Sequence, residues 1–140
     1  MIIADQKIRV GEWVSRKLGK ASGLYEYQSI GIERDGEIIA GVVIDNYKKN
    51  ASCSIHCAGD GGKWLNREFL FVVFDYVFRQ LQCKVVVNQV DSSNDKSIRF
   101  TSHLGFKESF RINGACENGD LIIFTLRRED CRWIRSCENG

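Results

Sequence analysis

The residues best suited to chemistry lie in the segment CAGDGGKWLNREFL, which begins at Cys57. Gly59, Gly61 and Gly62 allow the backbone to approach a ligand closely, and they lead into an apolar helical segment. The first N–H groups of a helix lack partners within it, and the helix dipole favours an anion there. The segment therefore predicts a phosphate or pyrophosphate site. A plain glycine loop with Asn66 as the helix N-cap is the alternative interpretation.

A second polar stretch, DSSNDKSIRFTSHLGF, follows a near-continuous apolar run. Asn94 is suited to cap the start of a helix and Gly105 to end one, so we predict a short helix over 95–104. The polar face of this helix would present Ser97 and Thr101. Capping explains most of this pattern, but it does not explain why the unit follows a glycine loop and a buried helix.

His56 is the third candidate, because imidazole is the side chain whose ordinary pKa lies nearest neutral pH. It could act as a general base, directly or through water, or it could be a packed strand residue. Cys53 and Cys57 flank it and carry atoms that can bind a metal. No second pair at matching spacing completes a four-ligand zinc site, so we expect structural cysteines and no metal.

The composition is typical of one globular domain, which we place over residues 1–140. The chain is 44% hydrophobic and 27% charged, has no proline, and its net charge of +2 predicts no nucleic-acid partner. No apolar run approaches the roughly 18 residues of a membrane span. No signal peptide precedes the six cysteines, so we expect reduced thiols in the cytoplasm. The arginine-rich tail from Arg127 to Arg135 is expected to be a solvated terminus.

The elements that must position these residues alternate between strands and helices. We expect, in order, an edge strand over 1–4, an amphipathic helix in the segment DQKIRVGEWVSRKLG that ends at Gly19, a hairpin around Asp35 and Gly36, a strand over 51–59, a largely buried helix over 66–82, a buried strand over 83–90, the short helix over 95–104, and two strands over 106–112 and 120–128 joined by NGACENG. This order predicts an α/β or α+β sheet with helices packed against it.

Over roughly residues 28–128 the sequence resembles the GNAT superfamily of N-acetyltransferases. The resemblance rests on the ERDGEIIAG hairpin, on the strand, glycine loop and long helix that follow, and on the block N-x-x-S-x-x-x-x-x-x-LGF with KESFR and GDLIIFTLRR behind it. These motifs are similar to the branch that includes ribosomal-protein N-terminal acetyltransferases. The resemblance implies a single mixed, mostly antiparallel sheet of about six to seven strands, flanked by helices and with splayed central strands.

The same resemblance implies that acetyl-CoA binds between the strands SCSIHCA and VVVNQV and donates its acetyl group to a primary amine by direct attack. The acceptor would be a protein N-terminus, a lysine or a small amine, and the protein a monomer or homodimer. Main-chain N–H groups of the glycine loop would hold the pyrophosphate, and those of the first strand the pantetheine. The implied cofactor-binding residues are Ile55, Cys57, Gly61, Gly62, Lys63, Trp64, Leu65, Asn66, Asn94 and Ser97. The implied catalytic residues are His56, Asn94, Thr101 and Ser102.

The sequence departs from the family pattern at three places. The glutamate that many relatives have on the SCSIHCA strand is absent, which leaves His56 as the candidate base. Thr101 occupies the place of a tyrosine that commonly protonates the departing thiolate, so Thr101 or Ser102 could only donate a hydrogen bond or relay a proton through water. Trp64 and Asn66 stand where the phosphate loop usually has glycines. The alternative is therefore a non-catalytic acyl-CoA-binding or protein-interaction domain with the same fold.

Overall fold

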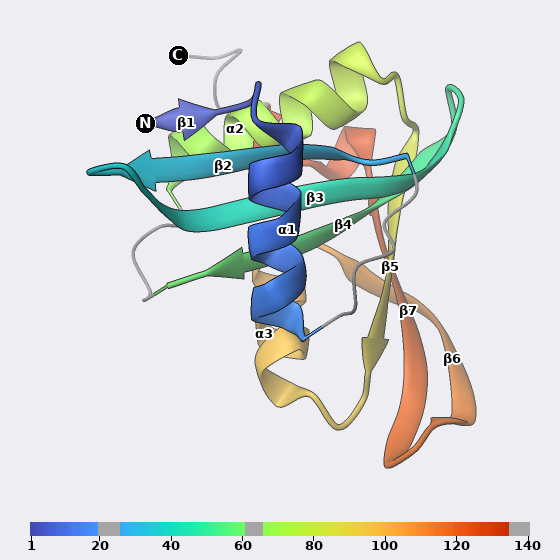
Figure 1. Ribbon diagram of the computed structural model, residues 1–140. Coiled ribbons are helices and arrows are strands. Elements are labelled where there is room, and N and C mark those ends of the chain that lie inside the picture. The colour runs from blue at the N-terminus through green and yellow to red at the C-terminus, as the bar shows by residue number, and fades with distance from the viewer. Residues whose placement is uncertain (20–25, 61–65, 135–140) are drawn as a thin grey trace.

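The protein forms one twisted sheet flanked by helices, shown as a computed structural model in Figure 1. The structure describes residues 1–19, 26–60 and 66–134. The strands of this part of the chain are β1 (Ile2–Ile3), β2 (Gln28–Arg34), β3 (Glu37–Lys48), β4 (Ser52–Gly59), β5 (Val85–Asp91), β6 (Lys107–Cys116) and β7 (Gly119–Arg127). They are arranged in the order β1-β2-β3-β4-β5-β7-β6. Among these strands β4 and β5 are parallel and every other neighbouring pair is antiparallel, which confirms the predicted mixed sheet.

The helices cover the two faces of the sheet. They are α1 (Lys7–Leu18), α2 (Arg67–Asp75) with the π-helix η1 (Tyr76–Gln80) directly behind it, α3 (Asp95–His103) and the short 3-10 helix η2 (Arg128–Asp130). In Figure 1, α1 crosses in front of β2, β3 and β4, whereas α2 lies behind the sheet. No helix within the described ranges combines the length and the apolar character needed to cross a bilayer.

The first helix packs on the sheet through two valines and two glycines. Val10 and Val14 of α1 are fully buried against β2, β3 and β4, and the helix ends at Gly19, which has a φ of 69°. Val10 also lies over Gly31, and both valines lie over Gly41. Glycine at these two positions lets the helix axis approach the strands closely, which places α1 beside the residues of β3 and β4 that face the same side.

Replacing Gly41 with alanine is expected to lower the free energy of unfolding by about 1–3 kcal/mol, the usual cost of overpacking. A methyl group built there would lie 2.8 Å from Val14 Cγ2 and 3.0 Å from Val10 Cγ1, so α1 would have to move away from β3. Urea unfolding measures the change. Glu12→Ala, at an exposed position of the same helix, is the control and should stay within about 0.5 kcal/mol of the wild type.

The second helix is largely buried, as its sequence predicts. Phe69 and Phe74 of α2 and Phe78 of η1 have no exposed surface, and they form the larger core with strands from both halves of the sheet. The expected single α-helix over 66–82 is wrong in one respect, because the α-helical part ends at Asp75. The wider π-turn that follows brings Val77 and Phe78 into the core side by side, both fully buried.

Two expectations about the end of the chain are wrong. The segment NGACENG was predicted to join two strands, but β6 runs through Gly114 to Cys116. Gly114, with a φ of 71°, takes up a register shift after Ile112, and its N–H donates to Asp120 Oδ1 over 2.9 Å. The tail is also not fully solvated, because Trp133 is 8% exposed and its Nε1–H donates to the Leu104 carbonyl over 2.9 Å.

The tail alternates between the core and the solvent. Cys131 and Ile134 are buried like Trp133, while Arg128 and Arg132 remain exposed. The charged side chains of this segment suggested a solvated terminus, whereas the apolar ones determine where it packs.

Candidate active site

β4 and β5 separate after their first residues. Ser52 pairs with Val85 and Cys53 with Val86, and within the described residues no further register pair joins the two strands. In Figure 1, β4 runs toward the left and β5 runs downward from this common point. The splayed central strands that the sequence resemblance implied are therefore present.

Two side chains take over the hydrogen bonding where the split begins. Ser54 Oγ donates to the Val87 carbonyl over 2.7 Å, and the Ile55 N–H donates to Asn88 Oδ1 over 2.9 Å. In a regular parallel pair, main-chain groups of the neighbouring strand would make these bonds. The side chains thus satisfy main-chain groups of both strands while holding the strands apart.

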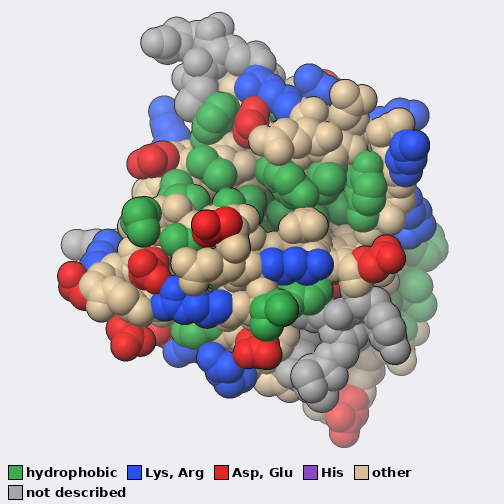
Figure 2. All heavy atoms as spheres, turned by 45° about the horizontal axis from the view of Figure 1, so that its top comes forward, with side chains coloured by type: hydrophobic (Ala, Val, Ile, Leu, Met, Phe, Trp, Pro, Cys, Tyr) green, Lys and Arg blue, Asp and Glu red, His purple; other side chains and the backbone are tan. Residues whose placement is uncertain are grey.

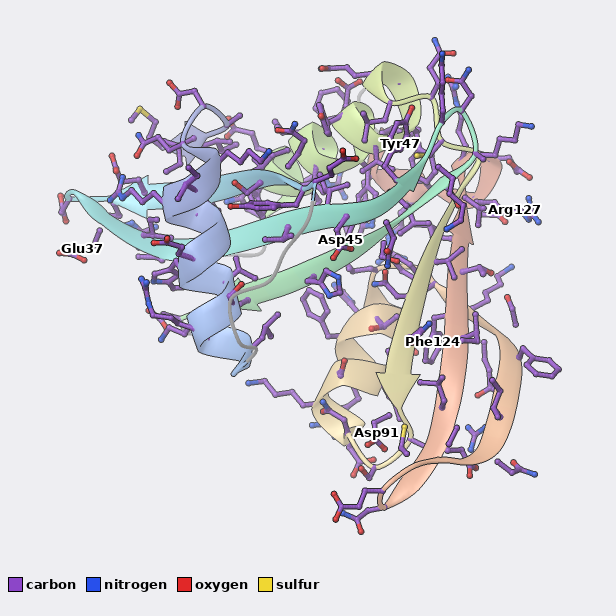
Figure 3. All side chains as sticks on the ribbon, turned by 45° about the vertical axis from the view of Figure 1, so that its right-hand side comes forward. Glu37, Asp45, Tyr47, Asp91, Phe124 and Arg127 are labelled. Carbon is purple, nitrogen blue, oxygen red and sulfur yellow. The ribbon has the colours of Figure 1, made fainter. Side chains whose placement is uncertain are left out.

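His56 and Asp45 form a hydrogen-bonded pair beside the split. Asp45 Oδ1 lies 2.9 Å from His56 Nε2, and the side chains are 15% and 26% exposed. His56 pairs across the strands with Val43, which packs against α1, so the imidazole lies on the α1 face of the sheet. Figure 3 shows Asp45 on the part of β3 beyond α1, toward β5. This pair helps to hold the ring at the edge of the opening.

The hydrogen bond relates the tautomer of the ring to its possible role as a base. If the imidazole is neutral and Nε2 carries the proton donated to the Asp45 carboxylate, the lone pair is on Nδ1. The pair can then accept a proton at Nδ1 and stabilise the resulting positive charge with the carboxylate. This is the chemistry of a general base with an orienting acid residue.

The residues of the expected phosphate loop are only partly described. Gly61, Gly62, Lys63, Trp64 and Leu65 lie outside the described residues. Asn66 is the N-cap of α2, and its Oδ1 accepts the Phe69 N–H over 2.8 Å. The position of Asn66 at the start of α2 agrees with the capping interpretation, and it is also where an anion would meet the helix dipole.

The predicted residues of α3 occupy different environments. Asn94 Oδ1 accepts the Ser97 N–H over 3.0 Å, so Asn94 is the N-cap that its sequence position indicates. Thr101 is buried, with 4% of its surface exposed, and Ser102 is exposed. The two hydroxyl groups that were predicted to act near the thioester therefore do not share one surface of the helix.

The cysteines of β4 are protonated thiols. Cys57 as a residue is only partly buried, but burial around its thiol raises the pKa to about 12. Burial also raises the pKa of Cys53, and the nearby thiol of Cys83 adds to this effect. Neither thiol is a good nucleophile near neutral pH, since the thiolate is the reactive form. Within the described residues, no group of three or more His, Cys, Asp or Glu side chains forms a possible metal site.

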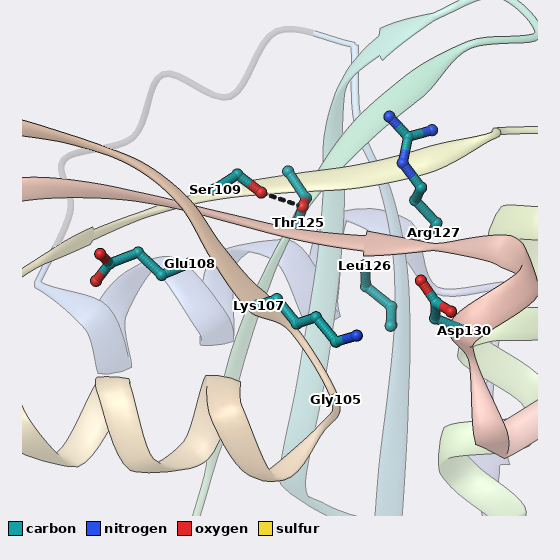
Figure 4. Close-up of a pocket in the computed structure, with 8 residues that line it drawn as sticks. All are labelled: Gly105, Lys107, Glu108, Ser109, Thr125, Leu126, Arg127 and Asp130. Atoms are coloured by element: carbon teal, nitrogen blue, oxygen red, sulfur yellow. Dashed lines mark hydrogen bonds between the residues drawn. The ribbon is translucent and has the colours of Figure 1, made fainter.

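A separate pocket lies at the β6–β7 edge of the sheet. It has a volume of about 260 Å³ and is lined by Gly105, Lys107, Glu108, Ser109, Thr125, Leu126, Arg127 and Asp130 (Figure 4). The hydroxyl oxygens of Ser109 and Thr125 are 2.5 Å apart. None of the residues predicted from the sequence as cofactor-binding or catalytic lines this pocket.

Charges of both signs are interspersed on the face shown in Figure 2. This agrees with the small net charge of +2. This face therefore has no continuous basic surface that would attract a highly charged polymer.

Two residues of the candidate site were not found from the sequence, namely Asp45 and Asn88. Asp45 is eleven positions before His56, and only the pairing of β3 with β4 brings the two together. Asn88 lies inside an apolar strand, where its polarity was the one available signal.

Comparison with known proteins identifies the fold. No protein-family model matches the sequence, and no curated protein matches it. A mutant of the spermidine N-acetyltransferase SpeG from Vibrio cholerae matches with a TM-score of 0.73 and 11% identity, over 98% of this chain and 97% of that chain. YncA from Salmonella typhimurium, solved with its cofactor acetyl-CoA, matches with a TM-score of 0.66 and 17% identity, over 91% of this chain and 92% of that chain.

A third structure, of a probable acetyltransferase, matches with a TM-score of 0.61 and 19% identity, over 74% of this chain and 62% of that chain. The present chain thus spans less than two thirds of that protein and nearly all of the other two. At these identities the similarity concerns the course of the backbone. The chain has the fold of these acetyltransferases.

Proposed function

We propose that this protein is an N-acetyltransferase that transfers the acetyl group of acetyl-CoA to a primary amine. The observation that carries the proposal is the split between β4 and β5, in a sheet with the fold of acetyltransferases. The spermidine N-acetyltransferase and the acetyl-CoA complex among the similar structures support the reaction and the cofactor. The N-x-x-S and LGF block supports the branch that includes ribosomal-protein N-terminal acetyltransferases, and the free cysteines fit a reducing cytoplasm.

The residues around the split fit an acyl-CoA in their chemistry. Main-chain groups of β4 past its short pairing with β5 suit the amide and thioester carbonyls of the pantetheine arm, and the N-terminus of α2, capped by Asn66, suits a phosphate. We assign the β4 main chain at Ile55 and Cys57 to the arm, apart from the Ile55 N–H, which is bonded to Asn88. We assign the loop from Gly61 to Asn66 to the pyrophosphate, and Asn94 and Ser97 to cofactor or acceptor. Acetyl-CoA, when bound, supplies a thioester carbonyl that a neutral amine can attack.

The chain's own contribution to the reaction is proton transfer and positioning. His56 accepts a proton from the ammonium group of the acceptor, directly or through water, and Asp45 keeps the imidazole oriented. The amine must be neutral to attack, and the pKa of a free amine is near 8 for an α-amino group and near 10.4 for lysine. The protonated thiols of β4 are consistent with direct attack rather than an acyl-cysteine intermediate. Thr101 or Ser102 would donate a hydrogen bond or relay a proton toward the departing thiolate.

Acetyl-CoA is expected to raise the melting temperature. A ligand at about 100 times its Kd that binds only the folded state adds about 2.7 kcal/mol to the free energy of unfolding, which corresponds to roughly 5–10 °C here. Pantetheine, which lacks the nucleotide, is the matched control and should give a smaller shift. The absence of any shift at millimolar acetyl-CoA would contradict the proposal.

A thiol-release assay with α-amino peptides, lysine and polyamines then tests transfer. Binding without thiol release for every amine would identify the non-catalytic acyl-CoA-binding domain instead.

A further inference from the structure

Asn88 occupies the place where the strands begin to separate. It lies on β5, and its Oδ1 accepts the N–H of Ile55 from β4 over 2.9 Å. The orientation of the carboxamide follows from this bond, because a main-chain N–H can only donate and the atom facing it must be the oxygen. Ile55 is 4% exposed, so losing this acceptor would leave a nearly buried N–H without a partner.

The bond changes which donors the split offers to a ligand. The Ile55 N–H is already used within the protein, whereas Asn88 Nδ2 carries two N–H groups. Within residues 1–19, 26–60 and 66–134, no hydrogen bond of Nδ2 occurs, and no buried side-chain nitrogen or oxygen lacks a partner. Nδ2 therefore keeps some exposed surface, on a partly buried residue beside the split. The Asn88 carboxamide thus occupies one main-chain donor, the Ile55 N–H, and brings two side-chain N–H donors close to it.

We propose that Asn88 is a ligand-binding residue whose Nδ2 donates a hydrogen bond to a carbonyl oxygen of the acyl-pantetheine arm. This inference rests on the proposed function, because it assigns the donor within the proposed cofactor site. The Ile55 bond fixes the carboxamide plane, so Nδ2 is held in place before the ligand arrives. A donor that is already oriented loses little conformational freedom on binding. The carbonyl belongs either to the thioester or to an amide of pantetheine, and both have the same acceptor chemistry.

Asn88→Asp separates ligand binding from a purely structural role. An aspartate oxygen can still accept the Ile55 N–H, but an ionised carboxylate has no donor for the ligand. We expect the Kd of acetyl-CoA, measured by calorimetry, to rise about 3- to 10-fold, which is the usual effect of one lost hydrogen bond. The hydrogen exchange rate of the Ile55 amide, measured by NMR, should stay as in the wild type. Asn118→Ala, in the exposed β6–β7 turn, is the control and should change neither quantity.

Three further measurements make the result specific. Asn88→Leu removes both the acceptor and the donors, so the Ile55 amide should exchange faster and the Kd should rise as well. Repeating the Asn88→Asp titration at about 0.1 and 1 M salt tests for charge repulsion. Salt screens such repulsion within about 3 Å at the higher concentration, but it does not restore a lost hydrogen bond.

Titration with CoA identifies the carbonyl. A loss confined to acetyl-CoA indicates the thioester, and an equal loss for both ligands indicates a pantetheine amide.

The two proposals fail in different ways. If the wild-type protein binds neither acetyl-CoA nor CoA, the proposed function is wrong. If the wild type binds and Asn88→Asp binds equally well, or recovers full affinity at high salt, Asn88 is a structural link only and this inference is overturned.

Discussion

His56→Gln is expected to lower kcat/KM for amine acetylation by about 10²- to 10³-fold, the range typical of losing a general base. Glutamine can keep a hydrogen bond to Asp45, since its amide N–H can replace the Nε2 donor, but it cannot accept a proton at neutral pH. The Kd of acetyl-CoA should remain close to the wild-type value, because the imidazole acts on the acceptor amine. Thiol release measures the rate, and calorimetry measures the affinity.

The role of Asp45 can be tested in the same assay by a double-mutant cycle. If Asp45 only positions His56, Asp45→Asn should lower kcat in the wild type and have almost no further effect in the His56→Gln background. A residue that merely stabilises the fold would lower activity by the same factor in both backgrounds. Asp75→Asn, whose carboxylate pairs with Arg79 on α2 and η1, is the matched control. Wild-type activity in His56→Gln would remove the imidazole from the mechanism.

The turns and helix ends of the fold could be predicted because single residues determine them. Asp35 and Gly36 have φ values of 54° and 80°, as a tight hairpin turn requires. Gly19 and Gly105 also have positive φ and follow α1 and α3, and Asn94 caps the start of α3. In each case the backbone conformation favours that residue type, so the sequence position alone is informative.

The site itself depends on pairings that local patterns do not encode. Whether Asp45 meets His56 is determined by the β3–β4 register, which shifts between Asp45 and Lys48 near the turn. The bond from Ile55 to Asn88 requires that β4 and β5 be neighbours and that their pairing stop early. The sequence therefore could not identify a partner for a lone histidine in a strand, and it gave no reason to assign a function to an asparagine in an apolar strand. Tertiary contacts decide both, over separations of 11 and 33 residues.

Phe74→Ala is expected to lower the free energy of unfolding by about 3–5 kcal/mol, as for other large aromatic deletions in a closed core. Phe74 has no exposed surface, and its ring stacks on that of Phe78, with centroids 6.1 Å apart and an angle of 18° between the planes. The deletion removes the transfer free energy of the ring and leaves a cavity between α2 and the sheet. Urea unfolding measures the loss.

Phe110→Ala is the matched control for this prediction, because it makes the same chemical change at an exposed position. Phe110 lies on the edge strand β6 with 64% of its surface exposed, so its deletion should alter the free energy of unfolding by less than about 0.5 kcal/mol. If the two variants lost similar amounts, α2 would not be held by this core. Since Asn66, the N-cap of α2, lies in the proposed phosphate site, Phe74→Ala should also weaken acetyl-CoA binding, whereas Phe110→Ala should not.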